Sequence, residues 1–130
     1  MKQFLLYAWQ LPQNLLGLLL ILILNPEKQF FRGNASVFIA SRMRGGISLG
    51  RYVIVSRNDR VGVAHELGHC VQSRRLGWIY LLTVGLVSGL RAGLNLYQRG
   101  HYYDGWPEDR ADRLGGVVRD ADGNRILKRP

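Results

Sequence analysis

A pair of histidines in the middle of the chain, His65 and His69, is the feature best suited to chemistry. The two residues are four positions apart, so on a helix their imidazoles share one face. Two neutral imidazoles at this spacing can occupy two corners of a zinc tetrahedron. Glu66 follows His65 directly and can reach a water molecule on the metal without ligating the metal. We therefore predict a Zn²⁺ site on a helix, with Glu66 as general base.

A catalytic zinc site needs three protein ligands and an open position for water. A third histidine six residues after His69 is excluded, because Arg75 occupies that position. Glu108 and Asp112 lie four apart in a segment that a proline precedes, which indicates a second short helix. We expect Glu108 to bind the metal and Asp112 to accept the Nδ1–H of a zinc histidine, by preference His65. An acidic residue in a first helical turn is also ordinary, but its pairing with the upstream histidines favours the zinc interpretation.

The two motifs together, His65-Glu66-x-x-His69 and Glu108-x-x-x-Asp112, resemble those of the gluzincins, the thermolysin-like zinc metallopeptidases, in a minimal single-domain form. The resemblance covers the two motif helices and the strands before them, but not the apolar N-terminus. It implies that the two histidines and Glu108 bind zinc and that Asp112 orients the first histidine. It also implies hydrolysis of a peptide or protein substrate through a zinc-activated water, with Glu66 as base. The small size, the apolar ends and the long insertion between the helices depart from the thermolysin type.

The histidine helix should extend over residues 60–76, with an N-cap among residues 56–59 and a stop at Gly77. Its face opposite the histidines carries an apolar stripe that we expect to be buried, formed by Val63, Leu67, Cys70 and Val71. Cys70 is the only cysteine, so no internal disulfide can form. Because it lies off the histidine face, we interpret Cys70 as a core residue.

Residues 36–40 and 47–56 are β-prone, and 44–46 between them have turn chemistry. They predict a small antiparallel pair, or part of a sheet of three or four strands. Residues 120–124 predict a hairpin turn. The expected fold is α+β: a zincin-like domain with a short antiparallel sheet, the two motif helices, and apolar helices at the N-terminus and in the middle.

Residues 4–24 are largely apolar, but Gln10, Gln13 and Asn14 would cost free energy inside a bilayer. Three alternatives stay open: a short or interfacial membrane helix, a buried core helix, or a cleaved signal. A second apolar run, 78–90, is short for a bilayer span and can be buried, surface-lying or re-entrant. We divide the chain into an apolar helical segment, 1–26, and a zincin-like domain, 27–130.

The formal charge is +9, which favours anionic lipid surfaces or nucleic acid. Since no nucleic-acid-binding motif is present, we expect no specific nucleic-acid partner. The charge and the apolar runs together predict a membrane-associated protein, on an undetermined side. A cytoplasmic location is expected instead if residues 4–24 form a core helix.

His101 and Tyr103, which precede the second motif in the chain, are candidates to stabilise the oxyanion of a hydrolytic intermediate. Such residues often only anchor loops. A second hypothesis for the whole chain keeps the zinc but not the chemistry. The protein would then be a non-catalytic, zinc-stabilised membrane-associated or adaptor protein, whose ligands serve folding alone.

Overall fold

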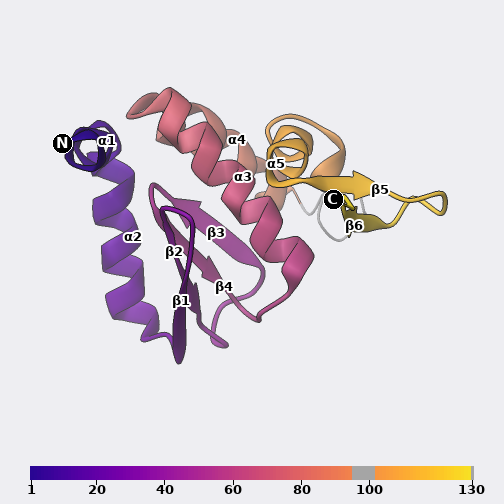
Figure 1. The fold of residues 1–130 in the computed structure, drawn as a ribbon, viewed down its shortest axis with the longest axis horizontal. Helices are drawn as coiled ribbons and strands as arrows, with labels where there is room; N and C mark the ends of the chain where they lie inside the picture. Colours follow the sequence, from indigo (N-terminus) through magenta and orange to yellow (C-terminus); the bar gives the residue numbers. More distant parts are fainter. Residues whose placement is uncertain (95–101, 130) are drawn as a thin grey trace.

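The computed structural model describes residues 1–94 and 102–129, which form an α+β fold (Figure 1). The first part comprises helices α1 (Lys2–Trp9) and α2 (Leu11–Leu24) and strands β1 (Lys28–Arg32), β2 (Ala35–Ile39), β3 (Gly46–Leu49) and β4 (Tyr52–Val55). Helix α3 (Arg60–Leu76), the π-helical turn η1 (Leu81–Gly85) and α4 (Leu86–Gly93) follow. The last part comprises the 3₁₀ turn η2 (Tyr102–Asp104), α5 (Glu108–Gly115) and the hairpin β5 (Val117–Arg119) and β6 (Arg125–Leu127).

The four-stranded sheet is mixed, with the order β1-β2-β4-β3. The predicted alternative of a sheet of three or four strands is confirmed. The predicted antiparallel pairing of residues 36–40 with the second extended stretch is wrong, because β2 pairs with β4 in parallel. That stretch divides at Gly50, whose φ of +66° allows a tight turn. The turn makes β3 and β4 an antiparallel hairpin, so β4 returns in the direction of β2. Strand β1, which pairs antiparallel with β2, was not predicted.

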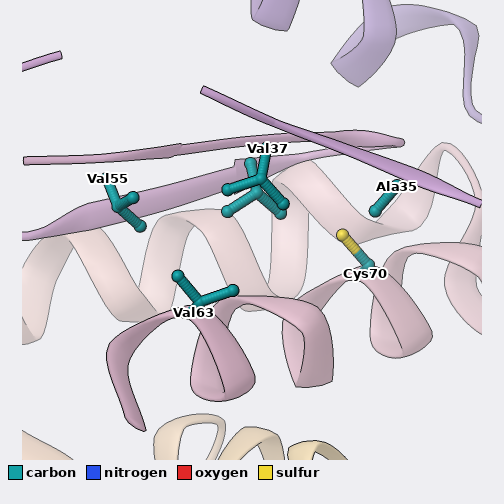
Figure 2. Close-up of a cluster of buried hydrophobic side chains, with 6 residues drawn as sticks. Ala35, Val37, Val55, Val63 and Cys70 are labelled. Carbon is teal, nitrogen blue, oxygen red and sulfur yellow. The ribbon is translucent and has the colours of Figure 1, made fainter. Parts of the chain in front are cut away.

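Helix α3 covers the sheet through a small apolar core (Figure 2). Val37 and Val55 from the sheet meet Val63 and Cys70 from the helix. The predicted core position of Cys70 is confirmed, and burial raises the pKa of its thiol to about 11. The ends of the helix are as predicted: the Asp59 carboxylate accepts the N–H groups of the first turn, and the helix stops at Gly77.

Helix α2 buries its polar residues and exposes its leucines, the reverse of the usual core helix. Gln13 is fully buried and Asn14 nearly so, whereas Leu22 is 79% exposed. Gln13 Nε2 donates to Gly77 O (2.6 Å) and to Ser73 Oγ (3.2 Å). These remote partners compensate the amide nitrogen of Gln13 for lost hydration, whereas its Oε1 atom has no hydrogen-bond partner among the described residues.

Within the described residues, no single helix has both the length and the apolar character to cross a membrane. Helices α1 and α2 satisfy that criterion only as a pair, and they are bent by 81° relative to each other.

The two motif helices, α3 and α5, pack closely together (Figure 1). Gly68 of α3 lies against the backbone of Ala111, and Gly115 of α5 lies against the backbone of Ala64. A Cβ atom at either glycine would overlap the facing carbonyl. The two glycines therefore permit the backbone approach that brings the histidines of α3 to the acidic residues of α5.

Candidate metal centre

The three predicted ligands meet where α3 packs against α5. Glu108 Oε2 lies 2.9 Å from His65 Nε2 and 3.0 Å from His69 Nε2. Glu108 has no exposed surface, and both histidines are buried. One turn of α3 supplies both imidazoles, and the first residue of α5 supplies the carboxylate. The structure thus joins residues that are about 40 positions apart in the chain, as their motifs predicted.

The donor set could hold a metal ion. One nitrogen from each histidine and one carboxylate oxygen lie within 4.8 Å of one another. A tetrahedral zinc with bonds of about 2.0–2.1 Å has ligand atoms about 3.3 Å apart. The 2.9 and 3.0 Å separations therefore need to widen by only a few tenths of an ångström to take the ion. Two imidazoles and one carboxylate are a ligand set of catalytic zinc sites.

Each histidine is oriented through its other ring nitrogen. His65 Nδ1 lies 2.7 Å from Asp112 Oδ1, the contact predicted from the sequence. His69 Nδ1 lies 2.7 Å from Gln72 Oε1. Since a carboxylate and an amide oxygen only accept hydrogen bonds, both rings carry the proton on Nδ1 and turn Nε2 toward Glu108.

The orienting groups are themselves held in place. Arg125 of β6 donates to both oxygens of Asp112, from Nε at 2.8 Å and from a terminal nitrogen at 2.5 Å. Gln72 Nε2 donates to Pro107 O at 3.0 Å, directly before α5. Neither Gln72 nor Arg125 was predicted. The position of Gln72, three residues after His69 on the same helical face, is a signal that could have identified it.

Glu66 lies beside the ligands without joining them. It is buried, and its Oε2 atom has no hydrogen-bond partner among the residues that the structure describes. Gly46 of β3 leaves room for this carboxylate, since a Cβ atom there would approach Glu66 Oε1 to 2.6 Å. Burial raises the pKa of Glu66 and outweighs the opposing charges of the two histidines. A buried carboxylate with an unused oxygen next to a metal site has the placement that a general base requires.

Charge coupling between the ligands shifts their pKa values in opposite directions. Burial alone lowers the pKa of His65, but hydrogen bonds with Asp112 and Glu108 outweigh it and raise the pKa to about 9. Burial alone raises the pKa of Glu108, but hydrogen bonds with His65 and His69 lower it to about 2. In the metal-free protein, His65 and Glu108 therefore form an ion pair around neutral pH, and a divalent cation would replace its proton.

Comparison with protein-family models, curated proteins and solved structures finds no match to this chain. The interpretation of the site consequently depends on its own geometry and on the two motifs.

Of the two oxyanion candidates, Tyr103 lies beside a predicted metal ligand. The ring of Tyr103 packs edge-on against His65, with the ring centroids 5.0 Å apart. The guanidinium of Arg125 stacks on the same tyrosine, 3.4 Å from the ring centroid. Tyr103 thus belongs to the surroundings of the site, whereas His101 lies outside the described residues.

One further contact comes from the apolar insertion. Ser88 Oγ of α4 donates a hydrogen bond to Glu108 Oε1, the carboxylate oxygen that does not face the histidines. Helix α4 of the insertion therefore contacts the candidate metal centre, and nothing in the local sequence around Ser88 indicated this.

Proposed function

We propose that this protein is a zinc-dependent metallopeptidase of a minimal gluzincin-like type, which hydrolyses peptide bonds with Glu66 as general base. The observation that carries the proposal is the convergence of His65, His69 and Glu108 beside the unpartnered Oε2 atom of Glu66. A site built only to hold a metal needs no buried carboxylate that is left without a hydrogen bond. A general base needs an oxygen of this kind.

A zinc ion held by His65, His69 and Glu108 would supply Lewis-acid chemistry for the scissile carbonyl and for a water molecule. Glu66 accepts the proton of the attacking water and delivers it to the leaving amine. Asp112 and Gln72 keep Nδ1 of the two histidines protonated, which leaves each Nε2 lone pair for the metal. Tyr103, packed against His65, is the described residue that we propose for stabilising the oxyanion.

The test is Glu66→Gln, which keeps the size of the side chain but removes the base. We expect this variant to bind as much zinc as the wild type and to lose at least about 100-fold in peptide hydrolysis. Zinc content and cleavage of a fluorescent peptide library are measured on the same samples. Glu27→Gln is the matched control, because Glu27 is exposed and its carboxylate accepts a hydrogen bond from Ser41, which is not a residue of the metal centre.

Two results would contradict the proposal. Undiminished hydrolysis by Glu66→Gln would exclude Glu66 as the base. A wild type that binds zinc but cleaves nothing in the library would indicate the non-catalytic alternative, in which the same ligands stabilise the fold.

We also propose that the enzyme works at the surface of an anionic membrane, on membrane-proximal substrates. Large exposed apolar side chains gather on α1, α2, η1 and α4, including Phe4, Leu19, Leu22, Leu82 and Leu86. Trp9 and Trp78, both about half exposed, stack with ring centroids 6.5 Å apart and join the two groups of helices. An extended apolar patch that is exposed to solvent marks a surface for contact with a protein or a membrane. The formal charge of +9 favours anionic lipid as the partner.

A further inference from the structure

A second candidate site lies on the other side of helix α3. A cavity of about 540 Å³ is enclosed by α1, the β1–β2 and β3–β4 turns, α3 and the end of α5. Helix α3 contributes Leu67, Val71 and Arg74, which lie on the face opposite His65 and His69. None of the proposed metal ligands lines the cavity. Its volume is within the usual range for sites that bind small molecules.

The charge of the cavity has one sign. Arg32 is the last residue of β1, Arg51 lies in the β3–β4 turn and Arg74 in the last turn of α3. No aspartate or glutamate is among the lining residues. Across residues 1–94 and 102–129, no ion pair joins any of these arginines to a carboxylate. Three arginines thus line one cavity, and the guanidinium groups of Arg32 and Arg51 lie over the rings of Phe30 and Tyr52. A cluster of cations of this kind attracts an anion.

Part of the remaining wall is apolar, beside polar side chains that include Gln3 and Asn34. Leu6 of α1, Leu67 and Val71 of α3, and Leu114 of α5 contribute aliphatic side chains, and the buried Cys70 lies among them. A small inorganic anion would leave this surface in contact with water. An anion that carries a hydrocarbon chain would cover it, and burying apolar surface is favourable.

The frame around the cavity is held by buried amides. Asn14 Oδ1 accepts the backbone N–H of Arg51 (2.9 Å), and its Nδ2 donates to Tyr7 O (3.1 Å). Gln10 Oε1 accepts from Ser73 Oγ (3.0 Å). These bonds fix α1 and the turn that carries Arg51, so both walls are in place before a ligand binds.

We propose that this cavity binds a single-chain amphiphilic anion, with its phosphate or carboxylate head on Arg32, Arg51 and Arg74 and its hydrocarbon chain along Leu6, Leu67 and Val71. Helix α1 forms one wall of the cavity, and its outer face exposes Phe4 and Leu5 to solvent. A lipid surface in contact with this face would therefore lie next to the cavity and supply such a molecule. The proposal needs neither zinc nor peptidase activity, since the two sites occupy opposite faces of α3.

The experiment measures binding of dodecyl phosphate to the full chain by isothermal titration calorimetry, below the micellar concentration. Inorganic phosphate and dodecanol are the two comparison probes: the first has only the head, the second only the chain. We expect dodecyl phosphate to bind at least tenfold more tightly than either. The double variant Arg32→Gln/Arg51→Gln should weaken its binding by about tenfold or more per guanidinium removed.

Two further variants separate a built site from a general effect of charge. Arg57→Gln/Arg129→Gln removes the same charge outside the cavity and should bind dodecyl phosphate like the wild type. Val71→Phe places a larger side chain in the apolar part of the cavity and leaves less room for the hydrocarbon chain. This variant should therefore show a smaller preference for dodecyl phosphate over inorganic phosphate. The far-ultraviolet circular dichroism spectrum, measured on each variant, should be unchanged and shows that the fold is intact.

Several outcomes would overturn the proposal. Inorganic phosphate as tight as dodecyl phosphate would mean a simple anion site, and dodecanol as tight would mean an apolar one. An equal loss in the Arg57→Gln/Arg129→Gln control would mean attraction to net charge alone. Each of these results can occur with full zinc content and full peptidase activity, so failure here is distinguishable from failure of the proposed function.

Discussion

The ion pair between His65 and Glu108 predicts how the stability of the metal-free protein depends on pH. The perturbation is to remove metal with a chelator and raise the pH from 6.5 to 9. Hydrogen bonds that His65 donates to Asp112 and Glu108 raise its pKa from 6.5 to about 9 in the folded protein, against the effect of burial. A raised pKa of this kind stabilises the folded state fully below pH 6.5, and the stabilisation is lost as the pH rises to about 9.

The size of the effect follows from the same values. Raising the pKa of a buried histidine from 6.5 to about 9 corresponds to roughly 3 kcal/mol of unfolding free energy. The pKa of Glu108 is lowered to about 2, so the stability from this carboxylate is present above pH 4.5 and is lost only as the pH falls toward 2. Between pH 6.5 and 9 Glu108 therefore contributes no change, and comparison with a variant that lacks the imidazole isolates the contribution of His65.

The assay is urea unfolding of the metal-free protein at pH 6.5 and pH 9, followed by circular dichroism. Between the two pH values, the free energy of unfolding of the wild type should fall by roughly 3 kcal/mol more than that of His65→Asn, because the variant has no imidazole to titrate. An equal loss in both proteins, or a wild type that is more stable at pH 9, would refute the reasoning that His65 is held protonated by Asp112 and Glu108.

Two other predictions concern the orientation of the ligands and the apolar surface. Asp112→Asn should weaken zinc binding by about 10–100-fold in a chelator competition, whereas Asp109→Asn on the same helix should not; equal affinities in the two variants would show that the contact with His65 does not tune the metal. Leu19→Gln/Leu22→Gln on the exposed face of α2 should reduce co-sedimentation with anionic vesicles by about tenfold per leucine, while Val118→Gln/Ile126→Gln on the C-terminal hairpin should not. Unchanged sedimentation of the α2 variant would exclude this face as the membrane contact.

Where the sequence predicted the structure well, the deciding interactions are local. The bounds of α3 follow from Asp59 at its start and Gly77 at its end, each within one turn of the residues it caps. The spacing of His65 and His69, and of Glu108 and Asp112, needs only helical periodicity. With both helices in place, the glycines between them allow the four side chains to meet.

Where the sequence failed, the deciding partners are remote. The parallel pairing of β2 with β4 depends on the turn at Gly50, and α2 covers that turn through Asn14. The burial of Gln13 depends on acceptors about 60 residues away, at Ser73 and Gly77. Periodicity within α2 cannot reveal such acceptors, so the sequence left open whether residues 4–24 form a membrane helix, a core helix or a cleaved signal.

Arg125 is a comparable case at the metal centre. It reaches Asp112 only because the β5–β6 hairpin folds back over α5. In the sequence, nothing distinguishes Arg125 from the many arginines that are expected on the surface. The hairpin turn itself was predicted and is confirmed. Its contribution to the site was not, because the contact is set by the tertiary arrangement.

The most direct test of the central claim is the zinc content of three purified proteins after dialysis against a weak chelator: the wild type, Glu108→Ala and Asp109→Ala. The two variants remove neighbouring carboxylates from the same helical turn, but only Glu108 faces the histidines. We predict one zinc per chain in the wild type and in Asp109→Ala, and loss of tightly bound zinc in Glu108→Ala. A full zinc complement in Glu108→Ala, or none in the wild type, would contradict a zinc centre built from His65, His69 and Glu108.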